Sequence, residues 1–453
     1  MTPARLAAVR VLVALDAGRT TLSAELERER PDLADRRDQA LFLELAAGTT
    51  RWRAALDARL GAHSRRPLAD LAPELRAILR LATYQLHHLD RIPEHAIVHQ
   101  SVEAARALGQ DRATTFVNAV LRNMIRARDQ KSPLPPRPTD GTDTESALDY
   151  LSVTLSHPRW LVARWLARVG FEACERWCVF NNTSPEIGVR ALQDDGSAGL
   201  MAMLGGHGIE AVPSRYVPGA ALLRAGGLGR LPPDIRQQLV VQDEGSKLVG
   251  WLAGGAPGDR VLDVCASPGG KTMMLAHAVG AAGMVIAGDI RPARVTLLRA
   301  TLERGQVPAR VLALDAAHEL PFGAVFDRVL LDAPCSGLGT LRRDPDIKWK
   351  RRPEDLPRFA ASQQTMLAHA AECVRPGGAL IYATCSSEPE ENDEVVQSFL
   401  AKTPAFELHR FETGASLPDA AATIDERGLL HSTPAAHALD AFFAALLVRR
   451  PAA

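Results

Sequence analysis

The 453-residue sequence has few cysteines, few aromatic residues and no excess of charge of either sign. Its 6 cysteines show no regular spacing, which is typical of a chain that keeps its thiols free in a reducing cytoplasm. No run approaches the roughly 20 apolar residues that cross a bilayer, so we expect a cytoplasmic protein without a membrane span. Lys plus Arg and Asp plus Glu number 53 each. A nucleic-acid site would therefore have to be a local patch.

The length and the changes of pattern along the chain predict several domains. The segments that differ are 1–130, 131–146, 147–232 and 233–453. The first has apolar residues at helical spacing and predicts an all-α domain. The second is rich in Pro, Ser, Thr, Asp and Gly and is typical of a linker. The third, with a helix expected over 158–179 and short extended runs, predicts a small α+β module.

The last segment alternates apolar strands with helices, a pattern that predicts an α/β domain with a mainly parallel sheet and helices on both faces. We expect its strands at 260–264, 284–288, 310–314, 326–331, 379–384 and 442–448. Ligands of such sheets bind beyond the carboxyl ends of the strands. The residues that follow each strand are therefore the candidates for function.

The first expected strand leads into a glycine turn, 265–272, that opens a helix. Glycines let backbone amides approach a ligand closely, and a helix N-terminus favours negative charge. The end of the turn resembles a phosphate-binding loop, but that motif requires glycine where Cys265 stands. A nucleotide triphosphatase is therefore the weaker interpretation.

Carboxylates follow the next three strands, as Asp289, Asp315 and Asp332. A carboxylate after the second strand commonly holds ribose hydroxyls in nucleotide-binding folds. An isolated Asp is usually a turn former. Three of them at successive strand ends favour a role in ligand binding.

Two cysteines, Cys335 and Cys385, lie in polar turns after different strands and are expected at the same edge of the sheet. A lone cysteine is usually a small core residue, and we expect this for Cys174, Cys178 and Cys373. No second ligand pair stands at a spacing suitable for a metal site. The two turn cysteines are therefore candidates for chemistry.

Several segments resemble the RNA cytosine-5 methyltransferases of the bacterial RsmB (Sun) family: Asp263–Thr272, Asp332–Thr340, Arg343–Trp349 and Ala383–Ser386. Others resemble the NusB-like helical domain that this family carries at its N-terminus: Ala47–Arg53, Leu81–Leu86 and Phe116–Arg122. The resemblance covers nearly the whole chain and implies a Rossmann-like class I methyltransferase fold for the last domain. The family often has glycine where Leu314 stands, which weakens the role of the Asp that follows.

The resemblance implies transfer of a methyl group from S-adenosylmethionine to carbon 5 of a cytosine in small-subunit (16S) rRNA. It assigns nucleophilic attack to Cys385, assistance in product release to Cys335 and contact with the base to Asp332. The residues expected to bind the cofactor are Cys265, Ala266, Ser267, Pro268, Gly269, Gly270, Lys271, Asp289, Asp315 and Asp332. The partner is expected to be small-subunit rRNA, with no metal and no membrane, and the chain is expected to be a monomer.

A basic segment follows the Cys335 turn and holds six basic residues and one aromatic residue. A charge run alone is usually a solvated loop, but beside a catalytic turn we expect it to clamp phosphates and stack a base. The residues expected to contact RNA are Arg342, Arg343, Lys348, Trp349, Lys350, Arg351 and Arg352. The Arg-rich helical domain is expected to extend this footprint.

Other specificities and one other class of protein stay open. The chain could modify cytosine in another RNA or in DNA, or it could modify a protein. DNA enzymes of this chemistry attack from the Pro-Cys turn, so the presence of a second cysteine, Cys385, argues against them. It could also be a non-catalytic RNA-binding or antitermination factor, as the NusB-like region suggests. Such a factor needs neither the glycine turn nor the paired thiols.

Overall fold

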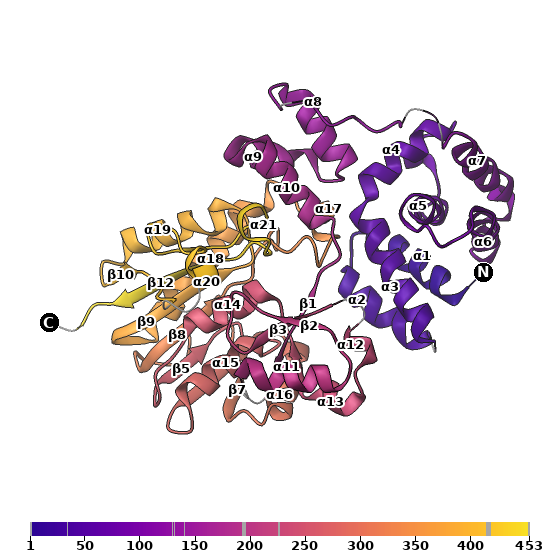
Figure 1. Ribbon diagram of the computed structural model, residues 1–453. Helices are drawn as coiled ribbons and strands as arrows, with labels where there is room; N and C mark the ends of the chain where they lie inside the picture. The colour runs from indigo at the N-terminus through magenta and orange to yellow at the C-terminus, as the bar shows by residue number, and fades with distance from the viewer. Residues whose placement is uncertain are drawn as a thin grey trace. The chain divides into compact units, whose positions relative to one another are not determined.

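The computed structural model describes residues 2–33, 35–128, 130, 132–139, 141–192, 196–224, 227–413 and 418–451. It divides into two compact units: Met1–Thr183 with Leu341–Pro353, and Ser184–Thr340 with Glu354–Ala453. Both units are drawn in Figure 1. Two residues of the expected linker, Lys131 and Asp140, lie outside the described residues.

The described part of the first unit is helical, which confirms the prediction for the N-terminal domain. Its α-helices are α1 (Pro3–Asp16), α2 (Leu22–Glu29), α3 (Arg36–Arg51), α4 (Arg53–His63), α5 (Pro73–His88), α6 (Glu94–Ala107), α7 (Thr114–Arg126), α8 (Thr144–Asp149), α9 (Arg159–Val169), α10 (Phe171–Asn181) and α17 (Ile347–Lys350). Helix α5 contacts α1, α3, α4, α6 and α7, and Figure 1 shows it at the centre of these helices. Ala77–Leu86 are all buried, so α5 forms the core of this bundle.

The single helix expected over 158–179 is two helices, α9 and α10. Gly170 separates them with φ +76°, a left-handed conformation that glycine adopts without strain. Its backbone N–H donates to the Leu166 carbonyl and ends α9. The expected module 147–232 is also divided, because α8–α10 belong to the helical unit and the strands that follow belong to the second unit.

The second unit begins with a small antiparallel sheet of order β2-β3-β1-β4. Its elements are β1 (Ile187–Ala191), α11 (Gly196–Gly206), β2 (Ala211–Pro213), β3 (Ala220–Leu223), α12 (Gly227–Arg230), α13 (Pro233–Gln237) and β4 (Leu239–Val241). Leu200 and Leu204 of α11 are fully buried against this sheet. The apolar face of one helix therefore completes a small separate core.

The larger sheet has the order β10-β12-β9-β8-β5-β6-β7, with β11 paired to β12. Its strands are β5 (Arg260–Asp263), β6 (Met284–Asp289), β7 (Ala309–Ala313), β8 (Phe326–Asp332), β9 (Val374–Thr384), β10 (Phe406–His409), β11 (Leu430–His431) and β12 (Phe443–Arg449). The neighbours from β9 to β7 pair in parallel, and β12 is antiparallel to β9. All six predicted strands are present, and the α/β prediction is confirmed. Strands β10 and β11 are additional to those predicted.

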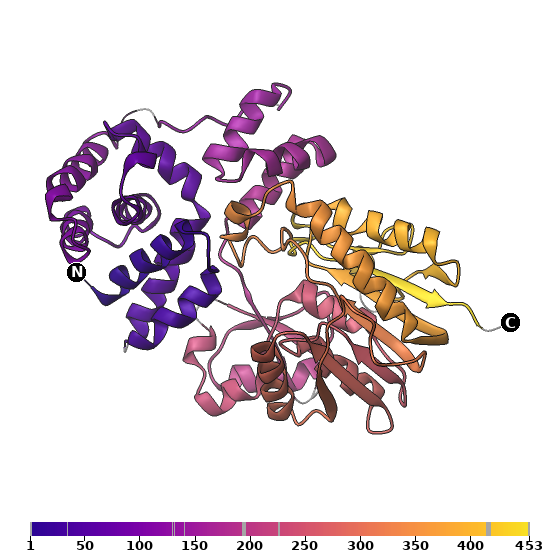
Figure 2. The same cartoon turned by 180° about the vertical axis from the view of Figure 1, so that it is seen from behind.

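Helices cover both faces of this sheet (Figures 1 and 2). They are α14 (Glu244–Ala253), α15 (Gly270–Val279), α16 (Pro292–Arg304), α18 (Asp355–Glu372), α19 (Asp393–Lys402) and the short α20 (Pro418–Ala421) and α21 (Pro434–His437). Alternate strand residues enter different cores: Leu330 packs with α14–α16, whereas Val329 and Leu331 pack with α18 and α19. Burial on both faces explains why the strands are continuous apolar runs in the sequence.

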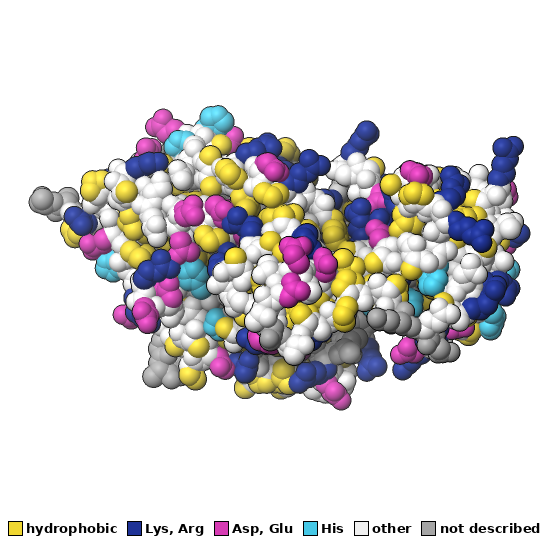
Figure 3. Space-filling model, turned by 90° about the horizontal axis from the view of Figure 1, so that it is seen from above, with side chains coloured by type: hydrophobic (Ala, Val, Ile, Leu, Met, Phe, Trp, Pro, Cys, Tyr) yellow, Lys and Arg dark blue, Asp and Glu magenta, His cyan; other side chains and the backbone are white. Residues whose placement is uncertain are grey.

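The surface carries both signs of charge. On the face shown in Figure 3, Lys and Arg side chains alternate with Asp and Glu side chains, in agreement with the balanced composition. Among the described residues, no helix has both the length and the apolar character needed to cross a membrane.

Candidate active site

The carboxyl ends of the parallel strands bring the predicted residues to one edge of the larger sheet. Strands β5, β6 and β8 end at Asp263, Asp289 and Asp332, and β9 ends just before Cys385. The register pairs Asp263 with Ala287 and Leu330, and Asp332 with Ala383, so each of these residues lies within two positions of the next along the sheet edge. Sheet geometry alone therefore gathers three carboxylates and a thiol.

The glycine turn between β5 and α15 approaches its neighbours closely. Gly269 has φ +108° at the start of α15, and a Cβ on Gly270 would lie 2.9 Å from the Gln242 side chain. The turn lines a cavity of 340 Å³. The predicted cofactor residues that line this cavity are Cys265, Ala266, Ser267, Pro268, Gly270, Lys271 and Asp332, whereas Gly269, Asp289 and Asp315 are not among its lining residues.

Two buried acceptors in this cavity have no hydrogen-bond partner among the described residues. They are Oδ1 of Asp263 and Oε1 of Gln242. Burial raises the pKa of Asp263 to about 7, because a charged carboxylate is costly inside a protein. A cationic ligand that donates hydrogen bonds would offset both the cost of the unpartnered acceptors and the cost of the buried charge. Neither residue was among the predicted cofactor contacts, although Asp263 could have been found because it ends its strand as Asp289 and Asp332 do.

Lys271 and Asp332 form an ion pair within the site. Nζ of Lys271 donates to Oδ2 of Asp332 at 2.6 Å and to Oγ of Ser246 at 2.9 Å. Burial opposes the charged ammonium, but Asp332 and, more weakly, Asp263 and Cys385 raise the pKa of Lys271. Thr272 donates to Asp263 at 2.7 Å. Both polar side chains that a phosphate-binding loop would offer to a nucleotide thus serve carboxylates, which disfavours the triphosphatase interpretation.

The two outer carboxylates have local partners. Asp289 is 3% exposed and accepts from the backbone N–H of Arg291 at 3.3 Å. Asp315 accepts from Ala317 N–H at 3.0 Å and lies 2.9 Å from Nδ1 of His318. This second arrangement is that of a turn former. The cofactor roles of both carboxylates stay predictions, and that of Asp315 has the weaker support.

The two predicted catalytic thiols lie in contact, with 3.0 Å between Sγ of Cys335 and Sγ of Cys385. Their turns are also joined through Gly339, whose backbone N–H donates to the Cys385 carbonyl at 3.0 Å. A Cβ on Gly339 would lie 2.7 Å from that oxygen, so only glycine allows this approach. Both thiols are partly exposed. The three cysteines assigned to packing, Cys174, Cys178 and Cys373, are buried, as predicted.

The thiol contact affects proton affinity. The hydrogen bond to Cys385 is the largest cause that raises the pKa of Cys335, followed by burial, the charge of Cys385 and the charge of Glu391. Cys335 therefore keeps its proton at neutral pH and can donate it toward the sulfur of Cys385. The contact favours one thiol and one thiolate over two thiolates.

The basic segment 342–352 folds with the helical unit, and most of its side chains are occupied there. Arg342 is buried, with its guanidinium carbon 4.1 Å from the centre of the Phe180 ring. Trp349 donates through Nε1 to the Thr50 carbonyl at 2.8 Å. Lys350 donates to the Thr20 carbonyl and to Asp346. These contacts hold the segment against α3 and the α1–α2 turn.

Lys348 corrects the expectation of a solvent-facing phosphate clamp. Its side chain is 1% exposed, and burial lowers its pKa well below the usual value. Lys348 and Arg342 are both buried within their own unit and do not face solvent, so the structure gives no support to their predicted contacts with RNA. Of the seven predicted RNA contacts, Arg352 is exposed and Arg343, Trp349, Lys350 and Arg351 are partly exposed.

A groove between α6 and α7 presents basic side chains that the sequence analysis did not single out. Its volume is 590 Å³. The lining includes three exposed arginines, two exposed histidines, two polar side chains of α7 and one carboxylate: Arg106, Arg122, Arg126, His95, His99, Thr115, Asn118 and Glu94. Arg122 donates to Asn118 at 3.1 Å. Cations around a groove are the features that bind a phosphate backbone.

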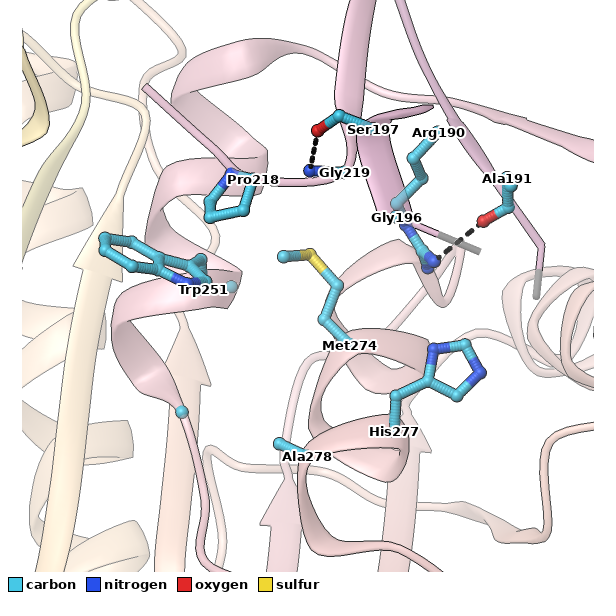
Figure 4. Close-up of a pocket in the computed structure, with 12 residues that line it drawn as sticks. Arg190, Ala191, Gly196, Ser197, Pro218, Gly219, Trp251, Met274, His277 and Ala278 are labelled. Atoms are coloured by element: carbon cyan, nitrogen blue, oxygen red, sulfur yellow. Dashed lines mark hydrogen bonds between the residues drawn. The ribbon is translucent and has the colours of Figure 1, made fainter. Parts of the chain in front are cut away.

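A further cavity of 430 Å³ lies in the second unit (Figure 4). Arg190 lines it and donates to the Ala191 carbonyl at 3.3 Å. Ser197 accepts from Gly219 N–H on the opposite side, and Trp251 and Met274 form an apolar wall. None of the predicted site residues lines it. Among the described residues, no group of three or more His, Cys, Asp or Glu could hold a metal ion.

Comparison with known proteins supports the methyltransferase interpretation. Residues 251–448 match the family described as 16S rRNA methyltransferase RsmB/F, and residues 2–126 match the NusB family. The chain is 36% identical to ribosomal RNA small subunit methyltransferase B of Pseudomonas putida over 88% of this chain and 89% of the relative. The chain belongs to the RsmB/F family. It is also 32% identical to a probable methyltransferase B of Bacillus subtilis over 91% and 90%.

Solved structures agree on the fold of this RsmB/F-family chain. The superposition with the crystal structure of PH0851 covers 99% of this chain and 99% of PH0851, with a TM-score of 0.79 and 23% identity. NSun6 from Pyrococcus horikoshii covers 64% and 98%, with a TM-score of 0.55 and 18% identity. The predicted family and fold are confirmed. The chain is an RNA methyltransferase by family, and its cofactor is S-adenosylmethionine, as predicted.

Proposed function

We propose that this RsmB/F-family chain methylates carbon 5 of a cytosine in small-subunit (16S) rRNA through a covalent adduct of Cys385. The observation that carries the proposal is the pair of thiols in contact at the strand edge, 3.0 Å apart, beside the Lys271–Asp332 ion pair. A methyltransferase acting on a nucleophilic oxygen or amine needs no thiol. Carbon 5 of cytosine is a poor nucleophile and needs one.

The cofactor site fits S-adenosylmethionine, whose ammonium and sulfonium groups are cationic and whose ribose donates hydrogen bonds. The unpartnered acceptors Asp263 Oδ1 and Gln242 Oε1 match these groups. The backbone of the glycine turn at 265–271 would lie directly against the ligand. Asp289 would accept from ribose hydroxyls. When bound, the cofactor supplies an electrophilic methyl group.

The thiols would act in sequence. The Cys385 thiolate adds to carbon 6 of the base, and the electron pair gained by the ring makes carbon 5 nucleophilic. After carbon 5 has taken the methyl group, a base must remove the carbon-5 proton so that the bond to sulfur can break. Asp332, held by Lys271 through Oδ2, would contact the amino group of the base with Oδ1. The target base must leave its stack to reach these groups.

The contact between the thiols supplies a reason for the order of steps. Two of the causes that raise the pKa of Cys335 come from Cys385, its hydrogen bond and its charge. Both disappear once Cys385 is bonded to carbon. The pKa of Cys335 then falls from its raised value, while burial and the charge of Glu391 continue to raise it, so Cys335 loses its proton more easily at the step that needs a base than before the attack. Before the adduct forms, Cys335 stays protonated and stabilises the attacking sulfur.

The helical unit would add affinity for RNA through the groove between α6 and α7. Arg106, Arg122 and Arg126 are exposed there, whereas the basic segment 342–352 is largely committed to contacts within its own unit. Phosphate contacts of this kind carry affinity and no sequence information. The groove therefore would position the RNA, and the strand edge would select the base.

The test is to map 5-methylcytosine in 16S rRNA from cells with the gene, without it and with a Cys385→Ala copy. We expect one cytosine to lose its methyl group in the last two strains. Loss only from another RNA would leave the chemistry and change the substrate. An unmodified base pattern in all three strains, together with no binding of S-adenosylmethionine, would favour the non-catalytic antitermination factor.

A further inference from the structure

Glu391 lies in the short turn η5 (Pro389–Glu391), six residues after Cys385, and its side chain is fully buried. The sequence around it, Glu388–Asp393, is acidic and would ordinarily be solvated surface. The Glu391 backbone is also fixed, because its carbonyl accepts from the Tyr382 hydroxyl at 2.6 Å. A carboxylate is therefore held at a defined place inside the second unit.

The two oxygens of this carboxylate accept hydrogen bonds from both cysteine turns. On the Cys335 side, the backbone N–H of Ser336 donates to Oε1 at 2.8 Å and its hydroxyl donates to Oε2. On the Cys385 side, the Ser386 hydroxyl donates to the same Oε2. Each serine directly follows its cysteine. A single side chain thus bonds the residue next to each thiol.

A third contact extends the connection to α18. Nε2 of Gln363 donates to Oε1 of Glu391 at 3.0 Å and to the Pro334 carbonyl at 3.0 Å. Pro334 precedes Cys335, so the Cys335 turn is held on both sides of the thiol. The two serine hydroxyls lie 3.2 Å apart.

Among the described residues, the hydrogen bonds to Glu391 come from neutral groups: one backbone amide, two hydroxyls and one amide side chain. Burying a carboxylate without a paired cation is costly, and replacing such groups with apolar ones often stabilises a protein. Stability alone therefore does not account for a carboxylate here. Its four acceptor directions match the need to hold two separate turns at once.

We propose that Glu391 is a positioning residue that clamps the Pro-Cys335-Ser336 and Thr384-Cys385-Ser386 turns so that the two sulfur atoms stay in contact. This inference rests on the proposed function for the meaning of the contact. It goes beyond it in assigning the geometry to one buried side chain. The negative charge of Glu391 also contributes to the raised pKa of Cys335, so the clamp both aligns the thiols and keeps Cys335 protonated before attack.

The test uses Glu391→Gln in the full-length chain, with Glu394→Gln as the matched control. Glu394 is an exposed residue on α19 three positions away. Gln keeps the length of the side chain but replaces one acceptor with a donor and removes the charge. We expect kcat to fall by about 10–100-fold with KM for RNA nearly unchanged, the scale of a displacement near 1 Å. The control should behave as the parent chain does.

A second measurement does not depend on methylation. The rate of alkylation of Cys335 by iodoacetamide is followed against pH in a Cys385→Ser background, with and without Glu391→Gln. Removing a nearby negative charge favours the thiolate, so the alkylation profile should move to lower pH with Glu391→Gln and stay in place with Glu394→Gln. If the parent chain forms no adduct with RNA, the proposed function fails, but this profile still tests the clamp.

Ser386→Ala removes one arm of the clamp without a buried charge and covers the case in which Glu391→Gln does not fold. It should lower kcat by less than Glu391→Gln does, with cofactor binding retained. A parent-like kcat and an unshifted alkylation profile in Glu391→Gln would overturn the proposal. A rise in KM with kcat unchanged would overturn it as well, because a clamp on the thiols acts after RNA is bound.

Discussion

The two cysteine turns and the basic segment 342–352, which directly follows the Cys335 turn in the sequence, were all predicted to contact RNA. In the structure these regions differ in their exposure to solvent. The thiols are partly exposed at the strand edge and in contact with each other, whereas Lys348 is 1% exposed and Trp349 bonds the backbone of α3. Parallel strands force their following residues to a common edge. A run of charges carries no such constraint, and its side chains can pack wherever the fold requires.

The largest expected effect on the strand-edge side of this comparison comes from Cys385→Ala. Methylation should fall by about 10³-fold or more, as for loss of other covalent nucleophiles. Binding of S-adenosylmethionine should be nearly unchanged, because the thiol contacts the base. Calorimetry and a methyl-transfer assay on the same sample check both. Full turnover by this variant would remove the covalent mechanism.

Asp289→Ala probes the cofactor half of the same edge. Loss of charged hydrogen bonds to ribose hydroxyls should weaken S-adenosylmethionine binding by about 1–3 kcal/mol, or about 5–150-fold in Kd. The exposed Asp111, in the helical unit, gives the control Asp111→Ala. An unchanged Kd would show that Asp289 is only a buried turn residue.

Lys348→Met tests the other side of the comparison. Since burial lowers the pKa of Lys348, the unfolded chain binds one proton more than the folded chain between that lowered value and about 10.4, the ordinary value for Lys. The free energy of unfolding should then rise with pH in this window by up to about 1.4 kcal/mol per pH unit. Lys348→Met should abolish this contribution, and denaturant titrations at several pH values measure it.

Arg352→Ala, an exposed change in the same segment, should leave the pH dependence intact. If Lys348→Met has the same slope as the parent chain, the amine is charged in the folded state. The segment could then face RNA after all.

The smallest effect concerns salt. Each phosphate contact contributes about 0.7–0.9 to the slope of log affinity against log salt, so Arg122→Ala with Arg126→Ala should flatten the slope for RNA by about 1–2. Lys348→Ala should not change it. A flatter slope with Lys348→Ala and an unchanged slope with the arginine variant would show that the basic segment, and not the groove, contacts the RNA.

The fold was predictable to the extent that its strands are buried on both faces. Apolar runs identify the buried strands β5, β6, β8, β9 and β12, and also the edge strand β7, which is mostly exposed. In β10 apolar and polar residues alternate and only Phe406 is buried, and β11 has only two residues. The break at Gly170 was missed because apolar periodicity continues across it from α9 into α10.

The site was predictable where a residue follows a strand, as for Asp332 and Cys385. Glu391 could not be found in this way, because its burial depends on serines and a glutamine from three other segments. Lys348 shows the reverse failure, since nothing in a basic run indicates that one lysine is buried. Long-range packing decides both cases.

The most direct test of the two-thiol account is to trap the covalent adduct. If Cys385 forms the bond and Cys335 assists its breakdown, Cys335→Ala should methylate once and stall as a denaturant-resistant band that carries labelled RNA and requires S-adenosylmethionine. Cys385→Ala should form no such band. An adduct with Cys385→Ala and none with Cys335→Ala would contradict the account and reverse the roles of the two thiols.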